Sequence, residues 1–495
     1  KWVEPDELVT CPTCNGGRLN EVARNVRVQD STIDQIARLS VSDAKEVVGK
    51  FKFTGKDGLI ARDIIPEITH RLRFMEEVGL GYLQLDRSAK TLSGGESQRI
   101  RLAAQLGSNL RGVLYVLDEP TIGLHPRDNA SLLDTLTALR DKGNSLVVVE
   151  HDEETMRRSN HVIDLGPGAG RFGGEVSAQG TLAQIRKNPN SATGKKLKHP
   201  LVHPMRGERR PIPARNAKAG WIRIEKATAN NLKNVSLGIP VGRMTVLCGI
   251  SGSGKSSLMR GVLQPAVRAN LPKDRSKPSE KTWKSIKGVD QIEAVYEVDQ
   301  SPIGKTSRST PGTYIKVFDE IRKLYAQVPD ARARGYTASR FSFNTEGGRC
   351  ETCKGNGQIK LEMNFLPTSY VECEDCHGMR YNDATLEILY NGKNIGEVMQ
   401  MSIDEANEFF EASPRISRTL GLLCDTGLGY LQLGQPSPTL SGGEAQRIKL
   451  VSELTRGVGR SQTAKLRQNR QPKSFLYLIE EPSIGLHMQD VERLL

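Results

Sequence analysis

The chain has 495 residues, enough for two to four domains with cores of their own. Lysine and arginine number 70 against 57 aspartate and glutamate, and the charge of +13 favours nucleic acid or another polyanion as a partner. No apolar run approaches the roughly 18 residues of a membrane helix and no signal peptide is visible, which excludes a helical membrane protein. We therefore expect a cytoplasmic protein without a membrane partner, and a fragment, because it begins at Lys1 and stops at Leu495 just after a motif that leads into more sheet.

The first motif is a cysteine pair, Cys11 and Cys14, followed by a tight Asn-Gly-Gly turn. Two thiolates do not complete a tetrahedral site. We interpret the pair as half of a zinc site whose partner pair precedes Lys1, with a redox pair or a surface pair as the alternatives. A helical region is predicted over about 61–80.

A glycine-rich pattern at Leu92–Ala103 returns almost unchanged at Leu440–Leu450. Its serine and glutamate predict a capping box at the start of an amphipathic helix, and its glycines let backbone amides approach an anion at the positive end of the helix dipole. The residues predicted to bind the phosphates of ATP in these two signatures are Ser93, Gly94, Gly95, Glu96, Ser441, Gly442, Gly443 and Glu444.

Acidic residues follow an apolar run at Val113–Leu117, which is typical of a strand buried on both faces of a parallel sheet. At the carboxyl end of such a strand we expect Asp118 to hold Mg²⁺ through water and Glu119 to orient the attacking water. A second buried strand, Ser145–His151, ends in a histidine placed to sense a γ-phosphate. An ordinary turn and a structural histidine are the alternative interpretations.

The second half contains a phosphate loop. Met244–Leu247 is predicted as a strand that runs into Gly249–Ser256, a match to G-x-x-x-x-G-K-[ST], and a helix is expected from Ser257 to Leu263. In this motif the lysine reaches the β and γ oxygens and the last serine ligates Mg²⁺. The predicted ATP-binding residues are Gly249, Ser251, Gly252, Ser253, Gly254, Lys255, Ser256 and Ser257, of which Ser256 also binds Mg²⁺.

Two further elements belong to this second site. Ala294–Val298 leads to Gln300, whose amide is placed to contact the metal and the attacking water. The strand and acid pair of the first half return in Phe475–His487, where Glu480 is the predicted Mg²⁺ residue and Glu481 the predicted catalytic residue.

Four more cysteines, Cys350, Cys353, Cys373 and Cys376, have the C-x₂-C-x₁₉-C-x₂-C spacing of a closed structural zinc site. Between the two pairs, Gln358–Leu366 alternates in a way that predicts a hairpin arm held by the metal.

Two basic segments separate these elements. Residues 191–220 interleave eight basic residues with prolines and are predicted as an extended linker. The tract 460–474 has five basic residues and no acid, and it is predicted as a surface loop, with contact to a DNA backbone as the alternative.

The sequence contains two copies of one unit. Asp118 and Glu480 are 362 residues apart, whereas the two signatures are 348 residues apart, and the tract 460–474 accounts for the difference. This internal repeat predicts two homologous halves.

Together these motifs resemble an ABC-type ATPase, and the cysteine module between phosphate loop and signature, with Gly-Leu-His after each acid pair, is similar to the UvrA family. The resemblance implies an α/β fold of two tandem ABC-type heads with parallel-sheet cores, helical signature subdomains and inserted Cys₄ zinc modules. The implied division is 1–60, the C-terminal part of the first zinc and signature insertion; 61–190, the C-terminal part of the first head; 191–220, the basic linker; 221–340, the N-terminal part of the second head; 341–400, the zinc-binding insertion; and 401–495, the signature helices and truncated Walker B region of the second head.

The resemblance also implies a function. UvrA is the damage-recognition subunit of the bacterial excinuclease, so we expect ATP-dependent binding of a homodimer to damaged double-stranded DNA in nucleotide excision repair, with ATP, Mg²⁺ and Zn²⁺ as cofactors, and transfer of the DNA to UvrB. In this arrangement the phosphate loop with Gln300, Glu480 and Glu481 meets the first signature, and Asp118, Glu119 and His151 serve another site with the second signature. The region that carries the first phosphate loop and contacts UvrB is expected to be absent.

Three alternatives remain. Two departures from the family, Glu480 in place of an aspartate and the basic tract 460–474, favour a UvrA-like paralogue for drug self-resistance or another non-repair task. Another is a DNA-binding remnant that binds ATP without hydrolysing it. A transporter or translation-associated ABC ATPase is the third, although transporter heads have no reason to carry an embedded Cys₄ module.

Overall fold

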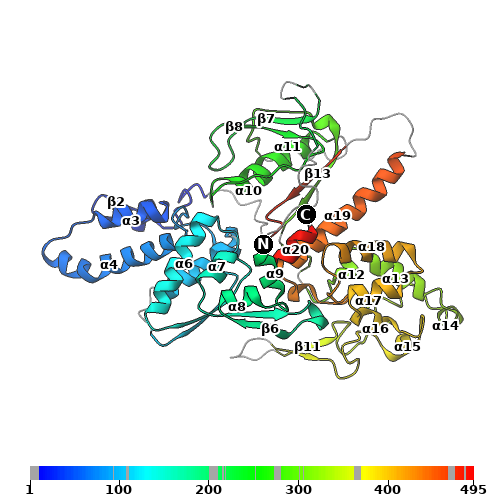
Figure 1. Ribbon diagram of the computed structural model, residues 1–495. Helices are drawn as coiled ribbons and strands as arrows, with labels where there is room; N and C mark the ends of the chain where they lie inside the picture. Colours follow the sequence, from blue (N-terminus) through cyan, green and yellow to red (C-terminus); the bar gives the residue numbers. More distant parts are fainter. Residues whose placement is uncertain are drawn as a thin grey trace. The chain divides into compact units, whose positions relative to one another are not determined.

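The computed structural model describes residues 11–92, 94–106, 111–199, 210–214, 217, 219–250, 252–271, 280–299, 301–304, 306–361, 369–465, 474–483 and 486–494. The chain divides into two compact units, Lys1–Arg158 with Cys248–Ser253, and Ser159–Leu247 with Gly254–Leu495. Figure 1 shows both units as mixtures of helices and short strands. None of the helices in the described ranges is long and apolar enough to cross a membrane.

The first unit packs helices around a short parallel sheet. Leu72 and Phe74 of α4 share its core with Leu132 and Leu139 of α6. The predicted helix over about 61–80 is confirmed as the larger part of α4. The elements are α1 (Glu21–Asn25), β1 (Arg27–Val28), β2 (Ser31–Thr32), α2 (Ile33–Ala37), α3 (Val41–Gly49), α4 (Gly55–Glu77), η2 (Ala89–Thr91), α5 (Gly94–Leu106), β3 (Leu114–Asp118), α6 (Pro126–Asp141), β4 (Ser145–Val149) and α7 (Glu153–Arg158).

Strands β3 and β4 are parallel, as predicted, and pair in register from Leu114 with Ser145 to Asp118 with Val149. Their predicted burial on both faces is wrong for the described residues. Successive side chains of a strand point to opposite faces. Tyr115 is buried in the core, whereas Val116 is 67% exposed, because the helices that pack in this core cover one face of the sheet.

The second unit holds the longer part of the chain. Its elements before the cysteine module are β5 (Val162–Gly166), η3 (Gly170–Phe172), β6 (Glu175–Gly180), α8 (Leu182–Lys187), α9 (Ala192–Lys198), β7 (Trp221–Ala227), β8 (Val235–Pro240), α10 (Lys255–Leu258), the π-helical η4 (Met259–Leu263), α11 (Gln264–Ala269), β9 (Ser285–Lys287), η5 (Val289–Gln291), β10 (Ile292–Val298), α12 (Pro311–Tyr314), α13 (Val317–Tyr325) and α14 (Pro329–Ala333). The remaining elements are β11 (Gln358–Leu361), β12 (Ser369–Glu372), α15 (Asp383–Leu386), α16 (Ile395–Gln400), α17 (Ile403–Phe409), α18 (Pro414–Asp425), η6 (Ser437–Thr439), α19 (Gly442–Lys465), β13 (Ser474–Ile479) and α20 (Met488–Leu494).

Two cores stabilise this unit. The antiparallel sheet β8–β7–β9 packs with α11 and β10, and β10 pairs in parallel with β13. Helices α12, α13 and α16 to α19 form a separate helical core, which lies together in Figure 1. The predicted hairpin is confirmed for its first strand, because β11 pairs antiparallel with β12, which lies beyond the predicted range and ends next to Cys373; residues 362–366 of the prediction lie outside the described ranges.

Three local predictions are wrong. Met244–Leu247 is not a strand, because it has no ladder partner among the described residues, and Met244 is 81% exposed. The interval 191–220 is not an extended linker throughout, since it begins with helix α9, whose Thr193 and Leu197 are buried. The tract 460–474 is not a loop over its first residues, which continue α19 to Lys465; residues 466–473 lie outside the described ranges.

The compact units also differ from the predicted division at 190. Segment Ser159–Lys198 belongs to the second unit. Its α9 contacts α20 through the Thr193 hydroxyl, 3.1 Å from His487 Nε2, and through an ion pair of Lys196 with Glu492. These contacts join residues almost 300 positions apart, which local sequence patterns do not reveal.

Candidate nucleotide site and cysteine cluster

The phosphate loop has the backbone that its glycines allow. Gly252 and Gly254 have φ of +73° and +98°, which side-chain-bearing residues rarely adopt. A Cβ on Gly254 would lie 2.8 Å from Asn231 Oδ1. Lys255 and Ser256 then begin α10, so their amides lie at a helix start suited to an anion. Ser251 lies outside the described residues.

Ser256 and Glu480 meet across 224 residues of sequence. The Ser256 hydroxyl donates to Glu480 Oε1 at 2.8 Å. Hydroxyl and carboxylate oxygens are ligand types that Mg²⁺ prefers, and neighbouring oxygens of an octahedral shell with ~2.1 Å bonds lie ~3 Å apart. The two predicted magnesium residues of this half therefore fit the ion in chemistry and in spacing.

One arginine, which was not predicted from the sequence, pairs with three carboxylates next to the phosphate loop. Arg260 lies 2.6 Å from Glu480 Oε2, 2.8 Å from Glu297 and 3.8 Å from Asp299. No motif marks it; it follows the phosphate loop on the same helical segment. The adjacent Gln300 lies outside the described residues.

Asp299 is charged at neutral pH. Partial burial raises the pKa of its carboxyl, but hydrogen bonds from Lys449 and Ser301 outweigh this effect and leave the pKa below its ordinary value. Lys449 comes from α19, so the second signature helix is tied to the acids beside the phosphate loop.

In the first half, the acid and the histidine predicted to act together are close. Glu119 Oε1 lies 3.2 Å from His151 Nε2. Glu119 and Glu481, the equivalent residues of the two acid pairs, have left-handed φ of +45° and +47°. Such conformations persist where surrounding structure enforces them, often at functional sites.

The signature helices begin where the glycines predict. The capping box is confirmed in the second copy, where the Ser441 amide donates to Glu444 at 2.7 Å and the Glu444 amide donates to Ser441 Oγ at 3.3 Å. In the first copy Gly94 and Gly95 open α5, and Ser93 lies outside the described residues.

The four cysteines of the second half form one buried cluster. Cys350, Cys353, Cys373 and Cys376 are at most 5% exposed, and all four sulfurs lie within 4.8 Å of one another. Two Sγ pairs are 3.6 and 3.9 Å apart, too far for disulfides. A tetrahedron with Zn–S bonds of ~2.3 Å has sulfurs ~3.8 Å apart. This Cys₄ cluster thus fits a structural zinc ion.

The cysteine pair of the first half differs. Cys11 is exposed, Cys14 is partly exposed, and neither belongs to a group of three metal-ligating residues among those the structure describes. The proposed half site therefore stays a prediction.

Relatives identify the family. The chain is 50% identical over 491 residues to the UvrABC system protein A of Streptococcus pyogenes serotype M1, which covers 98% of this chain and 50% of that protein. It is 51% identical over 493 residues to the UvrABC system protein A of Thermus thermophilus, covering 99% of this chain and 49% of that protein. Over these residues the chain belongs to the UvrA family. It spans about half the length of the curated relatives that it matches.

A solved structure agrees with the UvrA assignment. The crystal structure of UvrA2 from Deinococcus radiodurans matches 98% of this chain and 57% of its own with 42% identity and a TM-score of 0.85. The predicted α/β fold of ABC-type heads is thereby confirmed. No family model matches the chain.

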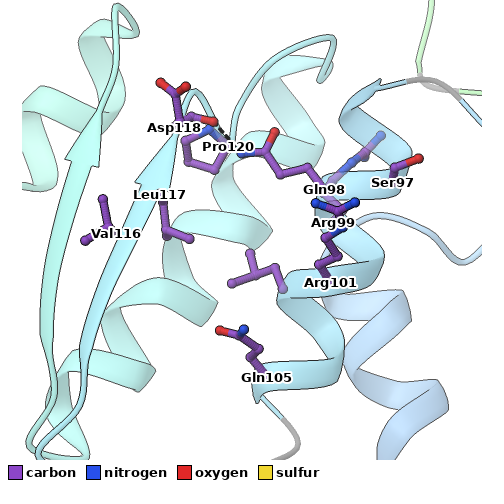
Figure 2. Close-up of a pocket in the computed structure, with 10 residues that line it drawn as sticks. Ser97, Gln98, Arg99, Arg101, Gln105, Val116, Leu117, Asp118 and Pro120 are labelled. Carbon is purple, nitrogen blue, oxygen red and sulfur yellow. Dashed lines mark hydrogen bonds between the residues drawn. The ribbon is translucent and has the colours of Figure 1, made fainter. Parts of the chain in front are cut away.

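The repeat in this UvrA-family chain contains residues that the sequence analysis missed. Gln98 of α5 donates to the main-chain carbonyl of Asp118, as Figure 2 shows, and the equivalent Gln446 of α19 donates to that of Glu480. Each signature helix therefore holds the strand end that carries its acids. The signal was present in the sequence, because both glutamines are part of the repeated signature.

Two tyrosines hold the signature glutamates. Tyr82 donates to Glu96 at 2.8 Å and Tyr430 donates to Glu444 at 2.5 Å. Burial and the neighbouring glutamate raise the pKa of Tyr82 to about 12, so its hydroxyl keeps its proton at neutral pH. Both tyrosines lie in a repeated Gly-Leu-Gly-Tyr-Leu-Gln-Leu segment, and this repeat could have predicted their equivalent roles from the sequence.

Proposed function

We propose that this chain takes part in ATP-dependent recognition of damaged double-stranded DNA in nucleotide excision repair. The observation that carries the proposal is its 50% identity, through 98% of its residues, to UvrABC system protein A. The motifs of an ABC-type ATPase and the Cys₄ cluster support the same function.

In the proposed ATP site, the amides of the phosphate loop and Lys255 bind the phosphates. Ser256 and Glu480, 2.8 Å apart, hold Mg²⁺, which supplies charge neutralisation at the phosphate oxygens when bound. Glu481 accepts a proton from the attacking water and orients it, and Gln300 contacts the same water. In the first half, Asp118, Glu119 and His151 are the corresponding metal, base and γ-phosphate residues.

For the two signatures, we propose that they contact the nucleotide held by the opposite half. The helices that begin at Gly94 and Gly442 direct backbone amides at the phosphates, and Tyr82 and Tyr430 fix the glutamates beside them. A homodimer on duplex DNA follows from the same proposal, and the charge of +13 supports contact with the phosphate backbone.

A second candidate function, ATP binding without hydrolysis, is favoured by Glu480. Its carboxylate contacts both the Ser256 hydroxyl and the Arg260 guanidinium, at 2.8 and 2.6 Å. An arginine that neutralises this carboxylate weakens its attraction for Mg²⁺. Release of inorganic phosphate from ATP, compared between the wild-type chain and Arg260→Gln, separates the two functions.

The deciding experiment is competition between a duplex with one bulky adduct and the same undamaged duplex, at fixed near-physiological salt, with and without ATP. Damage recognition predicts at least about tenfold preference for the adduct, changed by ATP. Equal binding to both duplexes, insensitive to ATP, would contradict the proposal and leave sequence-independent binding to a basic surface.

A further inference from the structure

An arginine follows each half's last cysteine pair at the same spacing. Arg18 follows Cys14, and Arg380 follows Cys376. Both arginines have left-handed φ, +59° and +71°. Few non-glycine residues adopt this conformation, and glycine is the residue that adopts it without strain. Asn15 and His377 are left-handed in the same two turns, with φ of +51° and +44°, so the two halves repeat one turn geometry that places the two arginines alike.

The two side chains reach equivalent targets. Arg18 Nη2 donates to the carbonyl of Asp86 at 2.9 Å, and Arg380 Nη2 donates to the carbonyl of Gly434 at 2.9 Å. Asp86 and Gly434 are 348 residues apart, the interval between the two signatures. The same link between cysteine module and signature segment therefore occurs twice in one chain.

In the second half, the Arg380 side chain is buried and donates to two different carbonyl groups. Arg380 is 5% exposed, and its Nη1 also donates to the carbonyl of Ser307 at 3.1 Å. Its guanidinium lies 5.2 Å from the centre of the Phe343 ring. No carboxylate pairs with it among the described residues, so carbonyl oxygens are its hydrogen-bond acceptors. Cys353 and Cys376 act on this guanidinium electrostatically, so a cluster of thiolates around zinc would offset its buried charge.

Further hydrogen bonds connect the Cys₄ cluster with the turn before the second signature. The segment Thr306–Ser309 lies between the Cys₄ cluster and the turn before the second signature. Ser307 Oγ donates to Asn356 Oδ1 at 2.9 Å, in the loop that follows Cys353. On the other side, the amide of Ser437 donates to the carbonyl of Ser309 at 2.8 Å.

The target segment leads directly to the signature glutamate. Gly434 directly follows the repeated segment Gly427–Leu433, whose Tyr430 donates to Glu444 at 2.5 Å. A displacement of Gly434 therefore acts on the start of α19 through the backbone between Gly434 and Tyr430 and the hydrogen bond of Tyr430 to Glu444.

We propose that Arg380, and Arg18 in the first half, is a positioning residue that couples the cysteine module to the signature helix. A filled Cys₄ cluster fixes Arg380, which holds the segment before α19 and keeps Glu444 in place. The effect on nucleotide binding rests on the proposed ATP site, whereas the effect on the segment itself does not.

The test compares Arg380→Met with Arg349→Met in the full chain. Arg349 is a matched control, because it precedes Cys350 and its side chain pairs with Glu346 and Glu351 instead of the signature segment. Zinc content, amide hydrogen exchange of Gly434–Glu444 and the Kd of a non-hydrolysable ATP analogue are measured for each. Wild-type protein treated with a zinc chelator is included.

For Arg380→Met we expect exchange of Gly434–Glu444 to rise about tenfold and the Kd of the analogue to rise at least about fivefold. For Arg349→Met, the exchange rate and the Kd both stay within about twofold of the wild-type values. Zinc removal from wild-type protein reproduces the faster exchange. Zinc removal from Arg380→Met does not increase exchange any further. Exchange in Arg380→Met that matches the control overturns the proposal.

If Arg380→Met loses zinc or fails to fold, Arg18→Met decides, because Arg18 is exposed and its loss does not open a core. We expect faster exchange at Asp86–Glu96 alone, and unchanged exchange there overturns the coupling. A wild-type chain that does not bind the analogue contradicts the proposed ATP site, and the exchange measurement then still tests the coupling.

Discussion

The two halves of the chain share the contacts around the signature and differ in the cysteine module. In both halves a tyrosine holds the signature glutamate, a glutamine holds the strand that carries the acids, and an arginine joins the cysteines to the segment before the signature. The cysteines themselves are buried in a group of four in the second half and lie at the surface as a pair in the first.

This difference separates the contacts that form in both halves from those that accompany the Cys₄ cluster. Hydrogen bonds of the signature are made by residues within each half, so they form in both. Burial of Arg380 accompanies a complete Cys₄ cluster, whereas Arg18 is exposed beside Cys11 and Cys14. Within the described residues, the second module is thus part of a protein core, whereas Cys11 and Cys14 of the first are exposed or partly exposed.

The largest effect is expected from cysteine substitution. Cys376→Ser removes one of four buried ligands and should lower the Tm of the zinc-loaded protein by ~10 °C or more, because structural zinc contributes directly to folding free energy. Cys14→Ser should shift it by less than ~2 °C. Differential scanning fluorimetry with zinc quantification measures both, and equal shifts contradict the proposed difference.

The second-largest difference is expected between substitutions of the two predicted catalytic glutamates. Glu481→Gln is expected to lower kcat for ATP about 10²-fold, the typical contribution of a general base. Glu119→Gln should leave phosphate release within about threefold, because the phosphate loop at 249–256 contacts the acid pair of the second half through Ser256 and Glu480. Steady-state phosphate release measures both variants. A larger loss in Glu119→Gln would reverse the assignment of the two acid pairs.

Removing the tyrosine hydroxyls should affect the halves alike. Tyr82→Phe and Tyr430→Phe each lose one hydrogen bond to a buried or half-buried carboxylate, at ~1–2 kcal/mol of unfolding free energy. Urea denaturation of both variants checks this. A loss of unfolding free energy in only one of the two variants would show that the signature contacts are not equivalent.

The smallest effect is a pH dependence at one position of the first half that has no acidic equivalent in the second. Hydrogen bonds from Lys45 and Ser42 lower the pKa of Glu76 from its ordinary value of 4.5, while the equivalent residue of the second half is Cys424. Because the folded pKa is lowered, the stabilisation is present above the unfolded pKa and is lost as pH falls through the folded pKa. In Glu76→Gln this acid-linked loss should disappear, which urea midpoints at pH 7 and pH 3.5 compare; an unchanged difference between the two midpoints contradicts the assignment.

The sequence predicted the elements whose residue types are dictated locally. Glycines at left-handed positions, the capping box at Ser441 and the cysteine spacing each follow from one short motif. The pairing of Ser256 with Glu480 follows from the known geometry of the phosphate loop and the acid-bearing strand.

Contacts between distant segments could not be predicted in the same way. Arg260 has no motif, and its role appears only when Glu297, Asp299 and Glu480 are brought together by the fold. Helix α9 was predicted as linker because its lysines and the following prolines indicate an extended chain, whereas packing against α20 decides its structure. The exposed face of β3 likewise depends on which elements cover it.

The most direct test of the nucleotide site is calorimetric titration of the wild-type chain, Ser256→Ala and Glu480→Gln with a non-hydrolysable ATP analogue, with and without Mg²⁺. We expect magnesium-dependent binding to the wild-type chain and at least about tenfold weaker binding to both variants in the presence of Mg²⁺. Binding that does not require Mg²⁺ and is unchanged in both variants would contradict the site.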